Sequence, residues 1–312
     1  MDIDLSLMAF LTGWGAATVR LAGPLLMAAL GELYAERAGV LNIGLEGTML
    51  LGAFAAWFTA WMSGSVWLGM TAGIAAGLMA GGVLAFLYVS ARASQVVAGI
   101  LFNMFALGLA SYLYRIALDG ADGAQTVPMF ADLPVPVLSA IPLLGPVLFH
   151  HSLPLYLTVV LVAVAAMVLY RTGFGLNLRA VGENPRAADT AGINVSLYRY
   201  VGVLIAGGMG GLAGGYLVLA QVGQFRETIV SGQGFIALAI VIFGRWDPLR
   251  AAGAALVFGA ADALQLSLQM FGTGVPPQVL LALPYVLTIL AMSGITGRAH
   301  QPEAFMQPYR RE

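Results

Sequence analysis

Long apolar runs recur along the whole chain and are separated by short polar connections. A helix that crosses a hydrocarbon core about 30 Å thick needs ~20 mostly apolar residues, whereas a barrel strand needs ~10 residues of alternating character. The runs here are long and do not alternate, so the pattern predicts membrane-spanning helices. The expected spans are 8–30, 48–62, 66–89, 96–117, 154–170, 200–221, 229–243, 251–271 and 277–293.

The segment 31–47 lies between the first two expected spans and combines apolar residues with charged ones. We interpret it as a broken or re-entrant helix. If this segment crosses the membrane, ten spans place the N-terminus inside; if it only dips, nine spans place it outside. The predicted fold is therefore an all-α bundle of nine or ten spans.

Composition supports a single transmembrane domain over residues 1–312. The chain is 60% hydrophobic and 9% charged, against roughly 25% charged residues in an ordinary soluble domain. The sequence has no cysteine, which excludes disulfides and thiolate sites. A net charge of −1 with scattered arginines gives no basic stripe for nucleic acid.

Arginines alone set the predicted orientation, because the sequence contains no lysine. Basic residues favour the cytoplasmic side, and the densest group lies at Arg171, Arg179, Arg186 and Arg199. We therefore expect 173–199 to be a cytoplasmic loop and 119–152, which has no arginine, to be extracytoplasmic. Alternation puts further arginines on the cytoplasmic side: Arg92, Arg245, Arg250, Arg298, Arg310 and Arg311.

Two of the expected spans carry glycine at every fourth position. Such stripes allow helix backbones to approach closely, so we assign both to the core of the bundle. The stripes are Gly69, Gly73, Gly77 and Gly81 in one span, and Gly207, Gly211 and Gly215 in the other.

The predicted cytoplasmic loop contains the local signals of a two-turn helix. Asn184 is a favourable N-cap, Pro185 occupies the preferred first helical position, and Gly192 can end the helix. An isolated helix of this length is marginal in water, so either the bundle or a partner protein must hold it.

At this loop the sequence resembles the coupling loop of permeases from binding-protein-dependent ABC importers. The similar branch handles branched-chain amino acids, simple sugars and nucleosides, and the nucleoside and simple-sugar members are the most alike. Two other stretches, 36–47 and 232–244, also resemble this family. The matching loop residues are Gly182, Glu183, Asn184, Pro185, Ala187, Ala188, Gly192 and Ile193.

The resemblance implies that the short helix sits in a cleft of an ATP-hydrolysing subunit and transmits its closure to the bundle. The residues expected to couple are Glu183, Asn184, Pro185, Arg186, Ala187, Ala188, Gly192 and Ile193. It also implies a second permease subunit, the same chain or a different one, an extracytoplasmic solute-binding protein, and a place in the bacterial cytoplasmic (inner) membrane among its lipids. The alternative is a capped helix that only orders its loop.

We expect this chain to be no enzyme and to bind no cofactor. A P-loop requires a lysine on the nucleotide phosphates, and lysine is absent, so ATP and magnesium are expected on the partner subunit. The histidines His150, His151 and His300 lack a matching set of metal ligands, and no metal site is expected.

Charged residues in 31–47 form the first candidate site within the membrane. A charged group at the bilayer centre costs about 2.5–3.5 kcal/mol on insertion scales, so these side chains must pair, reach an interface or line a cavity. We predict either an ion pair that fixes the broken helix or a gate. The residues are Glu36, Arg37, Asn42 and Glu46.

A second candidate site is a set of polar residues within otherwise apolar spans. Asp262, Gln265 and Gln269 share one helix face at spacings of three and four, and Asn103 lies in the middle of another span. These four residues are expected either to hydrogen-bond a hydroxylated solute along its path or to bond one helix to another.

The sequence thus predicts a permease that forms a gated path for a small polar solute. A nucleoside is the first expectation, followed by a simple sugar and a branched-chain amino acid. One alternative is a secondary transporter in which Glu32, Glu36, Glu46 or Asp262 couples an ion gradient to uptake. An intramembrane enzyme is a further alternative, although no nucleophile, base and orienting group fall together.

Overall fold

The computed structural model describes residues 2–119, 125–270 and 301–310, together with positions 279, 282, 286 and 289. Helices dominate these residues, as the apolar runs predict. The α-helices are α1 (Asp2–Arg37), α2 (Leu45–Ser63), α3 (Val66–Ala85), α4 (Gln95–Ala117), α5 (Leu144–Leu148), α6 (Leu153–Arg171), α7 (Gly173–Glu183), α8 (Pro185–Thr190), α9 (Val195–Tyr216), α10 (Gln233–Phe243) and α11 (Pro248–Met270). The π-helices η1 (Phe86–Ser90) and η3 (Leu217–Val222) extend α3 and α9, and the remaining elements are the 3₁₀ helix η2 (Leu138–Ala140) and the strands β1 (Asp132–Pro134) and β2 (His150–Ser152).

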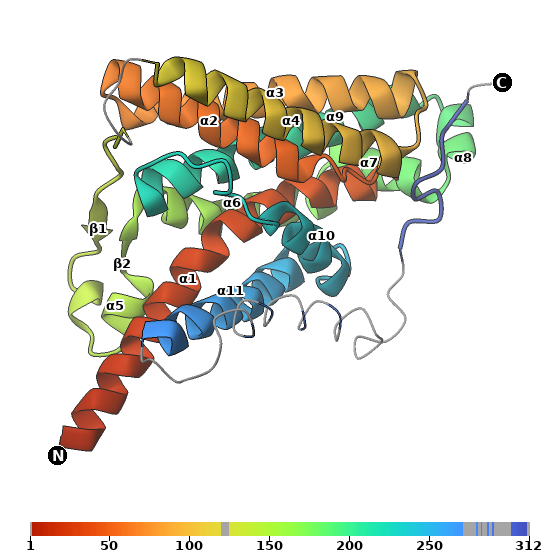
Figure 1. The fold of residues 1–312 in the computed structure, drawn as a ribbon. Coiled ribbons are helices and arrows are strands. Elements are labelled where there is room, and N and C mark those ends of the chain that lie inside the picture. Colours follow the sequence, from red (N-terminus) through yellow and green to blue (C-terminus); the bar gives the residue numbers. More distant parts are fainter. Residues whose placement is uncertain are drawn as a thin grey trace.

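Among the described residues, six helices are long and apolar enough to cross a membrane. Their connections gather at two ends of the bundle. The connections between α3 and α4 and between α6 and α9 lie at the end that also holds α8 (Figure 1); we call it the α8 end. The six candidate spans are Phe10–Arg37, Val66–Ser90, Gln95–Ala117, Leu153–Arg171, Val195–Val222 and Pro248–Gln269.

The segment 31–47 is not a helix of its own. Residues 31–37 continue α1, residues 45–47 begin α2, and only 38–44 are irregular. The segment therefore contributes no separate crossing, which favours the nine-span alternative over the ten-span one. The expected span 277–293 lies, apart from four single positions, outside the described residues.

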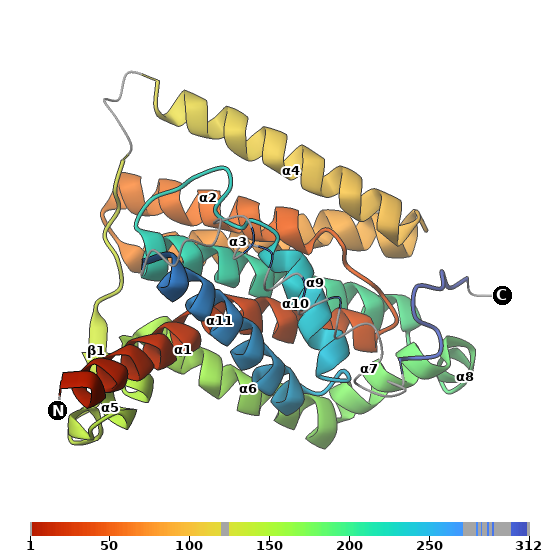
Figure 2. The same ribbon diagram turned by 60° about the horizontal axis from the view of Figure 1, so that its bottom comes forward.

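The core of the bundle is the packing of α2, α3 and α9, which lie side by side (Figures 1 and 2). Both glycine stripes lie in this core, as predicted, and the structure shows that they pack against each other. A Cβ atom at Gly77 would come within 2.7 Å of the Gly211 Cα, and one at Gly81 within 3.0 Å of the Gly207 Cα. The backbones of α3 and α9 are thus in direct contact, because no side chain separates them.

Short elements fill the described part of the long connection between α4 and α6. Strands β1 and β2 pair antiparallel, with Asp132 opposite Ser152, and η2 and α5 lie between them in the sequence. The connection lies at the end of the bundle opposite α8 (Figure 1). Its prolines break it into short pieces, as expected from their lack of a backbone donor.

Candidate functional site

Helix α8 has the capping geometry that its sequence predicts. The Asn184 side chain accepts a hydrogen bond from the Ala187 N–H at 3.0 Å, and Pro185 is the first helical residue. At the other end Gly192 has φ +84°, and the Ile193 N–H bonds to the Ala188 carbonyl at 3.0 Å. Both ends of this short helix are therefore closed by local interactions.

One side of α8 faces its own protein and the other faces outward. Ala188 is 4% exposed and packs with Val181 of α7 and Val195 of α9. Asn184, Arg186 and Ala187 are exposed. This small apolar contact holds α8 while leaving its outer side accessible.

The connection 38–44 between α1 and α2 is held by side chains from three helical elements. The Asn42 N–H donates to Glu32 Oε1 at 2.8 Å and the Leu41 N–H to Gln95 Oε1 at 2.8 Å. Tyr88 donates to Asn42 Oδ1 at 3.4 Å. Irregular backbone at a membrane protein's core must have its polar groups satisfied, and these side chains supply the partners.

Asn103 joins α4 to the beginning of α2. Its Nδ2 donates to the Ile43 carbonyl at 2.9 Å, and its Oδ1 accepts from the Gly47 N–H at 2.8 Å. Both bonds are contacts within the bundle, which is the alternative role considered for this residue. Helix α4 also lies across α2 from α11 (Figure 2), so Asn103 is not brought together with the polar residues of α11.

The polar stripe on α11 lies on one helix that packs against α1, α6 and α10. Gln265 is 7% exposed, Asp262 is half-buried, and Gln269 is exposed. Along the helix the buried Gln265 thus lies between the half-buried Asp262 and the exposed Gln269.

Glu46 caps a helix that begins inside the bundle. Its Oε1 and Oε2 accept hydrogen bonds from the Gly232 and Gly234 N–H groups, both at 2.7 Å. Helix α10 has 11 residues, about 16 Å at 1.5 Å per residue, or roughly half of a hydrocarbon core. The negative carboxylate therefore sits at the positive end of a half-length helix.

Glu36 and Arg37 bond to the turn between α10 and α11. The Trp246 Nε1 donates to Glu36 Oε2 at 2.5 Å, and Arg37 Nε donates to the Trp246 carbonyl at 3.0 Å. Trp246 is 3% exposed and has φ +55°. None of these hydrogen bonds joins Arg37 to Glu36 or Glu46. Glu36 and Arg37 instead bond to Trp246, and Glu46 bonds to the N-terminus of α10.

Glu32 and Glu36 each retain one buried oxygen without a hydrogen-bond partner in the described structure. These atoms are Glu32 Oε2 and Glu36 Oε1. Asn42 Nδ2 is likewise buried and has no described hydrogen-bond partner. Both carboxyl groups have 0% exposure. A buried polar atom without a hydrogen-bond partner lowers the stability of the fold. These atoms therefore make the region a candidate functional site and not only a contact between packed helices.

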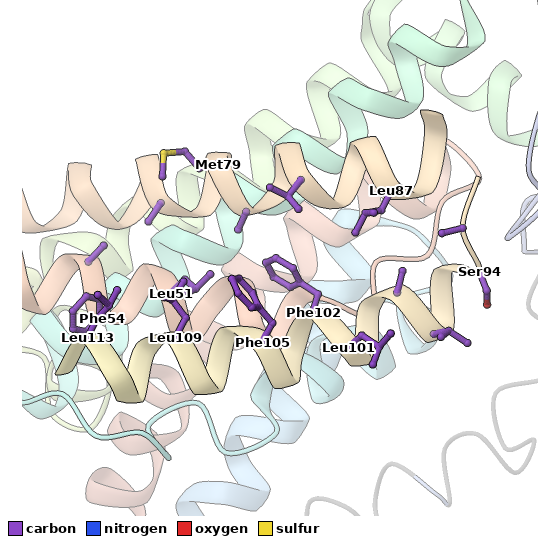
Figure 3. Close-up of a pocket in the computed structure, with 17 residues that line it drawn as sticks. Leu51, Phe54, Met79, Leu87, Ser94, Leu101, Phe102, Phe105, Leu109 and Leu113 are labelled. Atoms are coloured by element: carbon purple, nitrogen blue, oxygen red, sulfur yellow. The ribbon is translucent and has the colours of Figure 1, made fainter. Parts of the chain in front are cut away.

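A groove of about 870 Å³ opens between α2, α3 and α4 (Figure 3). Its walls are aliphatic and aromatic, including Phe54, Met79 and Phe102, and Ser94 is the one polar residue among its described lining. A hydroxylated solute would lose its hydrogen bonds to water here without replacement. The groove therefore does not suit a polar solute.

Three features of this region were not predicted, and only the first of them has a local sequence signal. Helix α7 begins directly after α6, where Thr172 accepts from the Gly175 N–H at 3.2 Å; this Thr-x-x-Gly start was the signal available. The second feature is the contact of Trp246 with Glu36, which lies 210 residues away in the sequence. The segment 301–310 crosses the α8 end (Figure 1), and its few apolar residues gave no indication of this.

Removing the Glu46 carboxylate is expected to destabilise the protein. Glu46→Ala leaves two part-buried N–H donors unpaired, at about 1–3 kcal/mol each, whereas Glu46→Gln keeps one acceptor oxygen and should lose about half as much. Thermal unfolding in detergent, followed by tryptophan fluorescence, measures both variants. Equal unfolding temperatures for wild type, Glu46→Gln and Glu46→Ala would contradict the capping role.

Known proteins resemble this chain over most of its length. The family described as "Branched-chain amino acid transport system / permease component" matches residues 16–292. A guanosine ABC transporter permease of Bacillus subtilis (strain 168) is 41% identical over 304 residues, which cover 94% of this chain and 95% of that protein. A nucleoside ABC transporter permease of Lactococcus lactis subsp. cremoris is 38% identical and covers 90% and 91%.

A third relative is a putative glucose ABC transporter permease of Haloferax volcanii, 36% identical with 98% and 99% of the two chains covered. The family match includes α8 and the connection 38–44. The chain is thus a multi-pass membrane protein and belongs to the family of branched-chain amino acid transport system permease components.

Proposed function

We propose that this protein is the permease subunit of an ATP-driven nucleoside importer in a bacterial cytoplasmic membrane. Helix α8 carries the proposal: it is closed at both ends, attached by the buried Ala188 and exposed on its outer side. An element of this kind can dock in another protein and pass on its movement. The guanosine and nucleoside permeases among the relatives support a nucleoside as the solute.

In this proposal ATP binding and hydrolysis take place on a separate subunit that contacts α8. The chain has no lysine for a P-loop, and the described residues contain no group of three or more metal-ligand side chains. A second permease, identical or different, completes the membrane part, and an extracytoplasmic protein delivers the solute. This chain itself makes and breaks no covalent bond.

The region between α8 and the connection 38–44 gives the proposed coupling a route. The Gly182 backbone, near the end of α7 and three residues before α8 begins, lies against the Arg37 carbonyl at the end of α1. Arg37 and Glu36 in turn bond to Trp246. A displacement of α8 therefore reaches the α1–α2 connection and the end of α10 through atoms in contact.

The solute path is proposed to follow the polar stripe of α11. Asp262, Gln265 and Gln269 offer hydrogen-bonding groups on one helix face, and Gln233 Oε1, at the start of α10, is buried without a described partner. Discontinuous helices often accompany solute sites in membrane transporters. Ribose hydroxyls and base edges are suitable partners for such amide groups.

A gradient-driven transporter is the second candidate, and the buried Glu32 and Glu36 favour it. Both carboxyl groups are fully buried with one unpartnered oxygen each, and intramembrane carboxyl groups serve as proton relays in pumps and transporters. The exposed, capped helix α8 has no role in that mechanism, which makes the importer the better-supported function.

Uptake into vesicles tests the proposal. Vesicles that hold this chain with the products of neighbouring genes are given labelled adenosine, ribose or leucine, with and without internal ATP. We expect adenosine uptake that requires both ATP and the solute-binding protein. ATP-independent uptake that stops when the ion gradient collapses would instead establish the gradient-driven transporter.

A further inference from the structure

The segment 301–310 is bonded to three separate parts of the α8 end. The Ala304 N–H donates to the Gly182 carbonyl at 2.9 Å, and the Met306 N–H donates to the Gly39 carbonyl at 3.1 Å. Arg199 Nη1, near the start of α9, donates to the Gln307 carbonyl at 2.7 Å. This non-helical segment is therefore bonded to the end of α7, to the α1–α2 connection and to α9.

Side chains strengthen these backbone contacts. Tyr309 donates its hydroxyl hydrogen to Asp189 Oδ2 on α8 at 2.9 Å and packs on the apolar cluster beneath α8. The Phe305 ring lies edge-on to Trp246, with centroids 6.3 Å apart. Ala304 is 4% exposed. Contacts of this number and burial show that the segment is a packed part of the protein.

Gly39 makes the close approach possible. Its φ is +85°, and an added Cβ atom would lie 3.0 Å from the Ala304 carbonyl oxygen and 3.3 Å from Arg199 Nη2. A side chain at this position would push the segment away from the α1–α2 connection. The backbone conformation and the available space are thus both fitted to the segment.

A polar cleft of about 620 Å³ lies between the start of α8 and this segment. From α8 and its approach it is lined by Glu183, Asn184 and Arg186, and from the segment by Glu303, Gln307 and Arg310. Its rim carries both signs of charge and is exposed. Such a lining fits a polar segment of a water-soluble protein and, unlike the groove in Figure 3, does not fit a lipid chain.

We infer that residues 301–310 and α8 form one docking surface for the ATP-hydrolysing subunit, and that the cleft between them receives a polar segment of that subunit. The inference rests on the proposed function and extends its contact surface beyond the short helix. Met306 of the segment bonds to Gly39, and Phe305 contacts Trp246. A displacement of the segment is therefore transmitted to the α1–α2 connection directly as well as through α8.

Site-directed photocrosslinking in the assembled transporter tests this surface. The natural chain has no cysteine, so Pro308→Cys, Ala187→Cys and Ser63→Cys each supply a single attachment point for a benzophenone maleimide. Pro308 and Ala187 are exposed on the segment and on α8, whereas Ser63 is exposed at the opposite end of α2. We expect the first two to crosslink to the ATP-hydrolysing subunit and Ser63→Cys not to do so.

The possible results separate the inference from the proposed function. Crosslinking from Ala187→Cys without any from Pro308→Cys would overturn the shared surface and leave α8 as the sole contact. Crosslinking from neither position would overturn both. As a second readout, Tyr309→Phe removes only the hydroxyl that bonds to Asp189. We expect this variant to insert normally into the membrane and to show a several-fold loss of uptake per ATP hydrolysed. An unchanged ratio of uptake to ATP hydrolysis would argue against a role of the segment in coupling.

Discussion

Replacing Gly77 with valine is expected to prevent the bundle from folding. A Cβ atom at Gly77 would lie 2.7 Å from the Gly211 Cα and closer still to the Gly207 carbonyl oxygen. Those are backbone atoms of α9, which no rotamer change can move aside. Overpacking a core that can adjust costs about 1–3 kcal/mol, and here α3 and α9 would have to separate along their length.

Gly82→Val is the matched control, because it makes the same change in the same helix. At Gly82 the nearest atom to an added Cβ is Leu204 Cδ2 at 3.9 Å, and the gain in helix propensity over glycine is equal in both variants. We expect Gly82→Val to give a monodisperse, wild-type yield in detergent and Gly77→Val to give little or none. Equal yields and unfolding temperatures would show that the α3–α9 contact is not the core of the bundle.

Much of the fold was predictable because its signals are local in sequence. The apolar runs place the long helices, and the four-residue glycine spacing assigns α3 and α9 to the core of the bundle. The continuation of α1 through Glu32 and Glu36 was not predictable. The partners of those carboxylates are the Asn42 N–H and the Trp246 indole, and the second lies 210 residues away along the chain.

The candidate site also has some features that local sequence predicts and others that depend on packing. Asn184, Pro185 and Gly192 act on residues next to them, so the capped helix follows from the sequence. Asn103 does not, because whether its amide contacts a solute or the backbone at Ile43 and Gly47 depends on how α4 packs on α2. The role of 301–310 also depends on packing, since three of its bonds reach Gly39, Gly182 and Arg199.

Gly192→Val is expected to uncouple ATP hydrolysis from uptake while the protein still inserts. Gly192 has φ +84° and open space around its Cβ position, so the substitution introduces backbone strain without a steric clash. A left-handed conformation costs an L-residue roughly 1–2 kcal/mol, and a β-branched residue is especially poor there. In a six-residue helix that strain is released by unwinding the last turn, which would move Ile193 and alter the outer side of α8.

Gly64→Val carries the same strain at a different place. Gly64 has φ +68°, also with no atom within 4 Å of an added Cβ, but it ends α2 at the side of the bundle opposite α8. Both variants should lose similar stability in thermal unfolding. Only Gly192→Val should hydrolyse ATP in the assembled transporter with uptake reduced by tenfold or more, because only there does the strain act on the surface that meets the ATP-hydrolysing subunit. If both variants lost uptake equally, general destabilisation would explain the result and α8 would have no special part in coupling; if Gly192→Val transported normally, the two-turn helix would serve only to order its own loop.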